Sequence, residues 1–380
     1  MEAGRFKKFK SEVFSKEICN TGRQTELDIG KALPILCLAF VHCVIECCTE
    51  EQLLSGIPFV FDAIIGGPLG APMFMFCMGA TIHFAKKRAP GDIAQRGVHL
   101  LLMGVLLNIF RFFIPFMIGY AITGNAEKYL VPLPFFFFGN DIFQFAGLAL
   151  ICIGLFIKLK VPKWAMAAIA VVTSVAGTFL RSTDLGSGVL NVIFGWFIGT
   201  ENEAGLVISD FPLLNWLIIP VCGYIFGSLL LRVRDKKRFY LSFSPVLLAA
   251  AVIVMAVEIH FEAGMFGPGE NAYYHLFSYD ALWFLALTLG LLGAYYGISR
   301  YLPERIIGFF SYTSKHISKF YCIHWVFVRL ITNVVFFVVL GTQIVPLGYI
   351  FLLSLGISLA TLLCLYVYDR FLNKHKRKFS

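Results

Sequence analysis

The stretch from Glu26 to Glu46, ELDIGKALPILCLAFVHCVIE, decides the fold. Charged residues at its start lead into an apolar run that ends on a histidine, His42. On a helix, His42 and Glu46 share one face because they are four residues apart, so they can form a hydrogen-bonded pair. Ionisable groups at membrane depth are costly and usually mark a functional site. The stretch therefore predicts a membrane span with chemistry at this pair.

The composition extends this prediction to the whole chain. Of its 380 residues, 58% are hydrophobic and only 14% are charged, with a mean hydropathy of +0.77. Apolar runs recur along nearly the whole length, which is typical of a polytopic membrane protein. The first thirty residues lack the apolar core and cleavage site of a secretory signal, so we expect the first span to stay in the mature protein.

The basic residues set the predicted topology through the positive-inside rule. With a cytoplasmic N-terminus and ten crossings, all basic residues face inside except Lys128 and Arg181 outside and Arg111 and Arg329 within spans. The predicted spans are residues 30–48, 69–85, 97–119, 141–158, 164–180, 211–231, 245–260, 280–300, 317–340 and 346–368.

A shorter apolar segment, residues 188–199, tests this count. Twelve residues of helix reach only about 18 Å, against a hydrocarbon core of about 30 Å. If the segment crossed the membrane, the basic cluster at 232–238 would face outside. We therefore predict a re-entrant or interfacial segment on the outer side. The predicted fold class is all-α: a polytopic membrane helical bundle with about ten transmembrane helices and cytoplasmic N- and C-termini.

The predicted organisation is simple. A basic cytoplasmic segment, residues 1–29, precedes a single transmembrane domain, residues 30–369, and a basic cytoplasmic tail, residues 370–380. The positive-inside rule accounts for the net charge of +9, so we predict no nucleic-acid partner. Seven of the ten cysteines lie inside apolar runs, and no disulfide framework or zinc spacing is visible. We predict no metal site.

Two polar residues are expected at similar depth. His42 is about 18 Å past Gly30, and Arg111 is about 22 Å past Arg96, at 1.5 Å per residue. A base and a fixed cation can thus face one cavity. Alternatives stay open, because Arg111 can snorkel to the outer headgroups and His42 can simply tie two helices together. Glu46 favours a poised base, unless it only marks the outer interface.

His324 lies about 10 Å into a later span by the same count, which makes it shallower than His42. A structural or ligand-positioning role is favoured over acid–base work. Arg329 and Asn333 continue the same span, and the sequence alone does not show whether they line a cavity.

Several blocks together resemble the heparan-α-glucosaminide N-acetyltransferase-like family of the transmembrane acyltransferase superfamily, which is related to acyltransferase type 3. The first block holds Asp28, Lys31-Ala32, His42 and Glu46, where the family has an aspartate, an arginine-glycine, a histidine and an acid. Further blocks lie at residues 72–79, 96–104, 138–148, 210–227 and 318–324. The resemblance covers roughly residues 23–330. It departs from the family at Lys31-Ala32 and at Pro68, where some members carry an acid.

The resemblance implies an integral-membrane acyltransferase that takes an acetyl or other short acyl group from cytoplasmic acyl-CoA. The acceptor is a hydroxyl or amine of a sugar or glycan on the outer side. The implied catalytic residues are His42, Glu46 and Arg111, with His42 as base or acyl carrier. The implied donor-binding residues are Lys31, Lys86, Lys87, Arg88, Arg96, Lys319 and His324, and the implied acceptor-binding residues are Asp141, Gln144 and Asp210.

The positive-inside rule alone also explains the basic loop, so its role in docking the polyanionic donor stays open. The main alternative function is a proton-coupled secondary transporter of a small solute, which also has many spans and a buried His/Glu pair. We find no inverted repeat to favour it. A non-catalytic scaffold is a third reading. We expect a multi-pass protein of the bacterial inner membrane, in contact with lipids, and leave a homodimer open.

Overall fold

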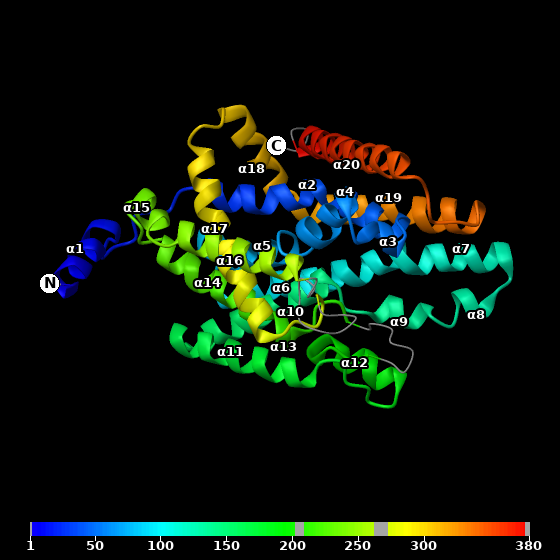
Figure 1. The fold of residues 1–380 in the computed structure, drawn as a ribbon, viewed down its shortest axis with the longest axis horizontal. Coiled ribbons are helices and arrows are strands. Elements are labelled where there is room, and N and C mark those ends of the chain that lie inside the picture. The colour runs from blue at the N-terminus through cyan, green and yellow to red at the C-terminus, as the bar shows by residue number, and fades with distance from the viewer. Residues whose placement is uncertain (1, 202–208, 262–272, 377–380) are drawn as a thin grey trace. The chain divides into compact units, whose positions relative to one another are not determined.

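The computed structural model describes residues 2–201, 209–261 and 273–376. Within these ranges the regular structure is helical, and the β-type pairing consists of three isolated bridges, Phe14 with Val233, Asn140 with Ser209 and Thr183 with Thr200. Figure 1 labels the helices along the chain. The chain forms two compact units. The first unit comprises Met1–Gly30, Ala71–Val105 and Phe138–Ile307, and the second comprises Lys31–Gly70, Leu106–Phe137 and Gly308–Ser380.

The first unit contains most of the longer helices together with several short elements. They are α1 (Glu2–Val13), α5 (Ala71–Thr81), η2 (Ile82–Phe84), α6 (Pro90–Asn108, up to Val105), α10 (Ile142–Lys158), α11 (Lys163–Leu180), α12 (Gly188–Ile198), α13 (Leu213–Trp216), α14 (Ile218–Leu230), α15 (Lys236–Leu241), α16 (Ser244–His260) and α17 (Ser278–Ser299).

The second unit carries most of α2 (Thr25–Cys47), whose first turns belong to the first unit. Its other elements are α3 (Glu50–Leu53), α4 (Gly56–Phe59), η1 (Val60–Gly66), η3 (Ile109–Phe113), α7 (Ile114–Thr123), α8 (Ala126–Tyr129), α9 (Leu133–Phe138), α18 (Glu304–Lys315), α19 (Ile317–Arg329), η4 (Leu330–Val339) and α20 (Leu347–Lys376). Helix α18 starts in the first unit and α9 ends there.

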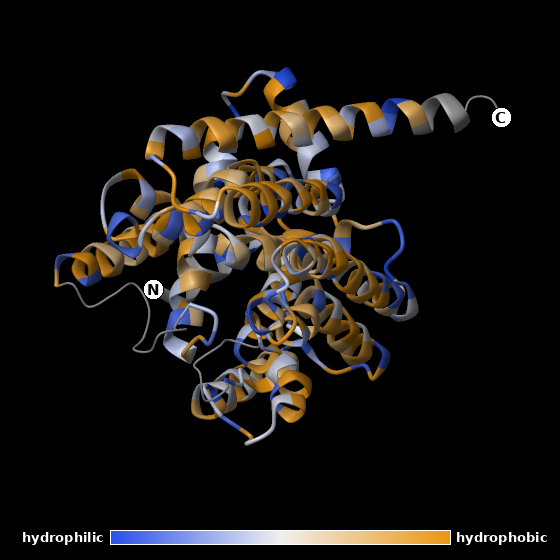
Figure 2. Ribbon diagram, turned by 90° about the vertical axis from the view of Figure 1, so that its right-hand side faces the viewer, coloured by the Kyte–Doolittle hydropathy of each residue, from blue (hydrophilic) through white to orange (hydrophobic). Residues whose placement is uncertain are grey.

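Nine helices in the described ranges are long and apolar enough to span a membrane. They correspond to nine of the ten predicted spans, and the tenth, α10, is apolar but has 17 residues. Figure 2 shows apolar residues along the lengths of the helices, with hydrophilic residues mostly at their ends and in loops. On α11, Val172 is 67% and Phe179 82% exposed, as expected of side chains that face lipid. The prediction of an all-α polytopic membrane bundle is confirmed.

Helices α5 and α14 pack so closely that their backbones touch. A Cβ atom on Gly79 would lie 2.0 Å from the carbonyl oxygen of Pro220, and one on Gly223 would lie 2.1 Å from that of Phe76. Small residues permit this approach, which is a common way for helices to associate in lipid, where the hydrophobic effect between them is weak. A larger side chain at either position would force the two helices apart.

Three segments of the second unit are π-helical, namely η1, η3 and η4. In a π-helix each N–H bonds to the carbonyl five residues back, so one turn holds an extra residue. The η3 segment joins α6 to α7, and η4 continues α19 directly. Such segments frequently occur at functional sites.

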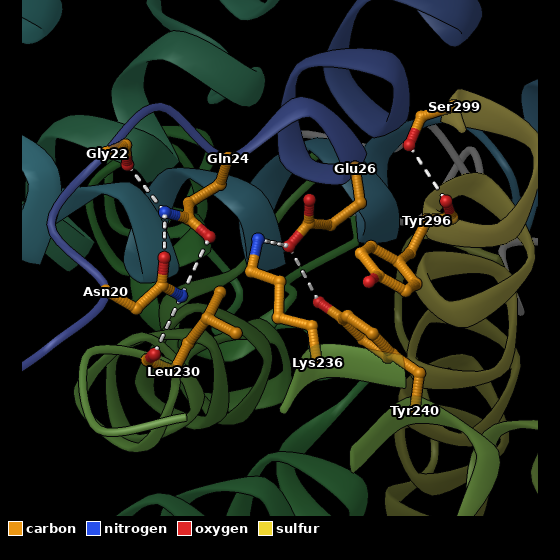
Figure 3. Close-up of polar contacts among 9 residues, drawn as sticks. All are labelled: Asn20, Gly22, Gln24, Glu26, Leu230, Lys236, Tyr240, Tyr296 and Ser299. Atoms are coloured by element: carbon orange, nitrogen blue, oxygen red, sulfur yellow. Dashed lines mark hydrogen bonds and ion pairs between the residues drawn. The ribbon is translucent and has the colours of Figure 1, made fainter. Parts of the chain in front are cut away.

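The start of α2 is held by a polar junction in the first unit (Figure 3). The Glu26 side chain is 1% exposed, and its Oε1 accepts hydrogen bonds from Lys236 Nζ at 2.8 Å and Tyr240 Oη at 3.0 Å. The Tyr240 ring stacks on Tyr296 with centroids 5.1 Å apart. This Glu26 junction ties α2 to α15 and satisfies a carboxylate that the apolar surroundings would otherwise penalise.

The short apolar segment predicted at 188–199 forms α12, which has 11 residues. Its Asn191 is buried and donates to Asp184 Oδ1 at 2.8 Å, while Asn191 Oδ1 accepts from the Leu185 backbone at 2.8 Å. The bonds from Asn191 and from the Gly186 backbone lower the pKa of the Asp184 carboxyl. These bonds hold the chain before α12 against the helix, which is too short to cross a bilayer.

Candidate active site

His42 lies near the far end of α2, in the second unit. The first turn of this helix carries Glu26 and Asp28, which suit the positive end of the helix dipole. The Nε2 atom of His42 is buried and has no hydrogen-bond partner in the described part of the chain. A buried polar atom without a partner is unusual and costly, so it calls for an explanation.

His324, on α19, lies beside His42. The two imidazole centroids are 5.4 Å apart with the rings 20° from parallel, and His324 has no exposed surface. The His324 Nδ1 lies 3.2 Å from the carbonyl oxygen of Phe320. A carbonyl only accepts, so Nδ1 carries the proton and, in the neutral ring, Nε2 holds the lone pair. The sequence analysis treated the two histidines separately, and the structure brings their rings into contact.

Trp325 lies between the histidines and Arg111, and we call these four residues the His42 cluster: His42, His324, Trp325 and Arg111. The sequence analysis did not single out Trp325. The Trp325 ring centroid is 3.9 Å from that of His42, and the guanidinium carbon of Arg111 lies 4.1 Å from the Trp325 ring centroid. Arg111 is 4% exposed and also lies 4.7 Å from the Phe112 ring. The predicted proximity of a base and a cation is thus present, and the arginine is buried against aromatic faces instead of reaching for headgroups. Its direct adjacency to His324 in sequence was the available signal for Trp325.

Glu46 does not form the predicted pair with His42. Its Oε2 accepts from Arg329 Nη1 at 2.8 Å, in a charge-assisted bond, and both side chains are 15% exposed. The arginine also lies 5.1 Å from the Phe112 and Trp325 rings. An ion pair with a guanidinium is stronger than a bond to a neutral imidazole, which explains the exchange of partners. Arg329 is therefore a site residue that the sequence analysis left unassigned.

The residues predicted to bind the donor fall in both units. Lys86, Lys87, Arg88 and Arg96 are exposed in the first unit, while Lys31, Lys319 and His324 belong to the second. Lys319 is engaged with the Asp369 carboxylate at 3.4 Å and lies 4.3 Å from the Tyr368 ring. Asp369 also accepts from Tyr312 Oη at 2.9 Å and lies 3.0 Å from His316 Nε2.

The residues predicted to bind the acceptor lie together in the first unit. Asp141 caps α10 through a bond from the Ile142 backbone, and Gln144 Oε1 accepts from the Asp141 backbone at 3.3 Å. The Asp210 backbone N–H donates to Asn140 at 2.9 Å. Asp141 and Gln144 thus form a helix capping box, a structural task that their spacing could have revealed. Gln144 Nε2 is buried without a partner in the described ranges.

Among the residues that the structure describes, no group of three or more His, Cys, Asp or Glu side chains is placed to hold an ion. The cysteines Cys43, Cys47 and Cys48 near His42 are buried and free.

The fold and the buried histidine cluster define an integral membrane, multi-pass protein with a site suited to proton transfer or acyl transfer. The family model for heparan-alpha-glucosaminide N-acetyltransferase, catalytic, matches residues 23–259. Since this match covers more than half of the chain, the protein belongs to that family and is a membrane acetyltransferase. No curated protein matches the chain significantly. His42 and Arg111 lie inside the matched range, whereas His324, Trp325 and Arg329 lie beyond it.

Proposed function

We propose that this protein transfers an acetyl group from cytoplasmic acetyl-CoA to a hydroxyl or amine of a sugar on the outer side of a bacterial inner membrane. The observation that carries the proposal is the buried Nε2 of His42, which has no hydrogen-bond partner among the described residues and lies near a second histidine and an arginine. The family supports an acetyl donor and a sugar acceptor. The positive-inside pattern supports the sidedness.

In the direct route, His42 removes the proton from the acceptor nitrogen or oxygen as that atom attacks the acetyl carbonyl. The C–S bond of the thioester breaks and a C–N or C–O bond forms. The coenzyme A thiolate then takes the proton from His42 and leaves as the thiol. In the alternative route, Nε2 attacks the acetyl carbonyl first, the C–S bond breaks and the coenzyme A thiolate leaves. The acceptor then attacks the acetyl-imidazole, the bond from Nε2 to the acetyl carbon breaks, and the acceptor's proton passes to the thiolate. Atoms balance in both routes without a metal or an oxidant.

The neighbouring residues have distinct tasks in this proposal. His324, whose Nδ1 proton is held by the Phe320 carbonyl, packs its ring beside that of His42 and helps to hold it in position. Arg111 stabilises negative charge on the acetyl oxygen, with its guanidinium held in place by Trp325. Lys31, Lys86, Lys87, Arg88, Arg96 and Lys319 supply positive charge for the donor phosphates. Asp141, Gln144 and Asp210 are proposed to contact the sugar.

Acetyl-CoA turnover by the purified protein in lipid vesicles tests the proposal. Thiol release is followed with a panel of amino sugars and glycans, for the wild type, His42→Ala and His260→Ala. His260 is an exposed histidine outside the cluster and serves as the matched control. We expect His42→Ala to lose about 10³-fold in turnover, in line with general-base catalysis, and His260→Ala to resemble the wild type.

Other outcomes decide between functions. Retained turnover in a folded His42→Ala variant overturns the histidine mechanism. If the wild type neither binds nor consumes acetyl-CoA, a proton-coupled transporter becomes the better account. Acid quenching of a reaction with labelled acetyl-CoA and no acceptor separates the two routes, because only the second leaves label on the protein.

A further inference from the structure

A second polar cluster lies one helical turn beyond His42, within the second unit. It consists of Glu46 at the end of α2, Arg329 at the end of α19, Thr332 and Asn333 on η4, and Gln343 in the loop before α20. We call it the Glu46 cluster. The loop is tied to α2 by a bond from the Val345 backbone N–H to the Cys47 carbonyl at 3.3 Å. The Glu46 cluster is thus formed by α2, by α19 with η4, and by the loop before α20.

The Asn333 side chain is oriented by two donors. Its Oδ1 accepts from Gln343 Nε2 at 3.0 Å and from Arg329 Nη1 at 3.5 Å, while the Thr332 hydroxyl beside it donates to the Val328 carbonyl at 3.0 Å. An amide oxygen that receives several donors leaves its nitrogen pointing the other way. Asn333 Nδ2 has no acceptor in the described part of the chain.

Two acceptor atoms of the cluster are also unused. Glu46 bonds through Oε2 and Gln343 through Nε2, so Oε1 of each has no donor within the described ranges. Neither oxygen is fully enclosed, and the Glu46 side chain is 15% exposed. In a membrane-embedded protein such atoms must meet water or a ligand, because lipid cannot satisfy them. The cluster therefore offers one oriented donor and two oriented acceptors.

We propose that the Glu46 cluster recognises the ring hydroxyls of the acceptor sugar, an inference that rests on the proposed function. A vicinal diol donates to Glu46 Oε1 and Gln343 Oε1 and accepts from Asn333 Nδ2, which matches the unused atoms in number and kind. One helical turn, about 5.4 Å, separates Glu46 from His42, and this is the scale of a single sugar ring. The group that reacts at His42 and the hydroxyls bound here then belong to the same ring.

This role replaces the predicted one for Glu46. In that prediction Glu46 orients His42 and stabilises its charged form, whereas here it binds substrate while paired with Arg329. Arg329 then acts as a positioning residue that holds Glu46 and Asn333. In this proposal these side chains bind the ring hydroxyls, whereas His42 carries out the acid–base chemistry.

Two acceptors of similar size test the proposal, glucosamine and cyclohexylamine, which carries an amine on a ring without hydroxyls. The variant is Gln343→Ala, and the matched control is Thr342→Ala, whose hydroxyl bonds only within its own loop, to Ile344. We expect Gln343→Ala to raise the KM for glucosamine about tenfold, the effect of one or two lost hydrogen bonds. The KM values for acetyl-CoA and cyclohexylamine stay unchanged, as do all values in Thr342→Ala.

A purely structural role gives a different pattern. An equal rise in every KM, or no change for glucosamine, overturns the sugar subsite. Wild-type acetylation of cyclohexylamine but of no sugar also overturns it, while the transferase function stands. If the wild type consumes no acetyl-CoA, the proposed function fails, and the subsite is judged by binding alone. Glucosamine should then still raise the unfolding midpoint of the wild type and not of Gln343→Ala, and equal shifts refute it.

Discussion

The Glu26 junction and the His42 cluster differ in how their polar atoms are satisfied, although both residues lie on α2. Glu26 is buried, and one of its oxygens receives donors from Lys236 and Tyr240. His42 presents a buried nitrogen without a partner among the described residues, beside a second imidazole.

This difference separates a structural ion pair from a candidate active site. In apolar surroundings an ionisable group needs local partners, and a protein that leaves such a group without one sacrifices stability. Glu26 has such partners in the Glu26 junction, so we assign the junction to stability. His42 has a buried nitrogen without a partner among the described residues, so we assign the His42 cluster to function. Each assignment can be tested by asking whether a substitution changes folding or turnover.

The largest effect on folding is expected for Lys236→Met. It leaves the buried Glu26 carboxylate with the Tyr240 hydroxyl and no counter-charge, which should lower the free energy of unfolding by about 3 kcal/mol. Turnover per folded molecule should stay the same. The measurement is the unfolding midpoint in detergent together with acetyl-CoA turnover. Lys237→Met, at the adjacent exposed lysine, is the control. Lost turnover at an unchanged midpoint would make the Glu26 junction a functional site and erase the contrast.

Arg111→Lys should show the opposite pattern. The planar guanidinium that lies 4.1 Å from the Trp325 ring centroid is replaced by a compact ammonium, which does not stack in the same way. If Arg111 stabilises charge on the acetyl oxygen, kcat should fall about 10²-fold. Lys128→Gln is the control, because Lys128 lies 3.8 Å from the Phe337 ring without being part of the cluster. A fall in stability with unchanged kcat would place Arg111 with the structural residues.

The smallest effect is expected for Tyr312→Phe, which sharpens the contrast at a third polar site. Removing the Tyr312 hydroxyl, which donates to Asp369, should lower the free energy of unfolding by about 1 kcal/mol. Burial, with help from this bond, raises the pKa of Tyr312 from 10.0 to about 12. A raised pKa stabilises the fold fully below pH 10, and this contribution disappears as the pH rises to about 12. Unfolding midpoints along an alkaline titration should fall less steeply in the variant; parallel curves contradict this.

The spans were largely predictable because hydropathy is a local property. The predicted segments 164–180 and 280–300 correspond to α11, Lys163–Leu180, and α17, Ser278–Ser299, within two residues at each end. The short segment α12 was also expected, since its length alone distinguishes it from a span. For the site, the sequence identified His42 and Arg111 by their depth, and the structure places both against Trp325.

The partners of these residues were not predictable in the same way. Glu46 and Arg329 are 283 positions apart, and no local pattern links them. The contact between the His42 and His324 rings was not predicted, because counting residues along each helix does not say which faces of two helices meet. The capping box of Asp141 and Gln144 was also missed, although their spacing indicates it, and their assignment to the acceptor stays a prediction. Which side chains pair with one another depends on tertiary contacts, and these contacts cannot be read from a single sequence.

The π-helical segments of the second unit have a consequence for any comparison of related chains. Each π turn adds a residue, so everything after it is rotated relative to a regular helix. Arg111 lies within η3, and Asn333 lies within η4. Removing one residue from η3, which has five residues, would restore an ordinary helix and turn the side chains that follow it to another face. A relative that is one residue shorter here can keep every motif letter and still have lost the site.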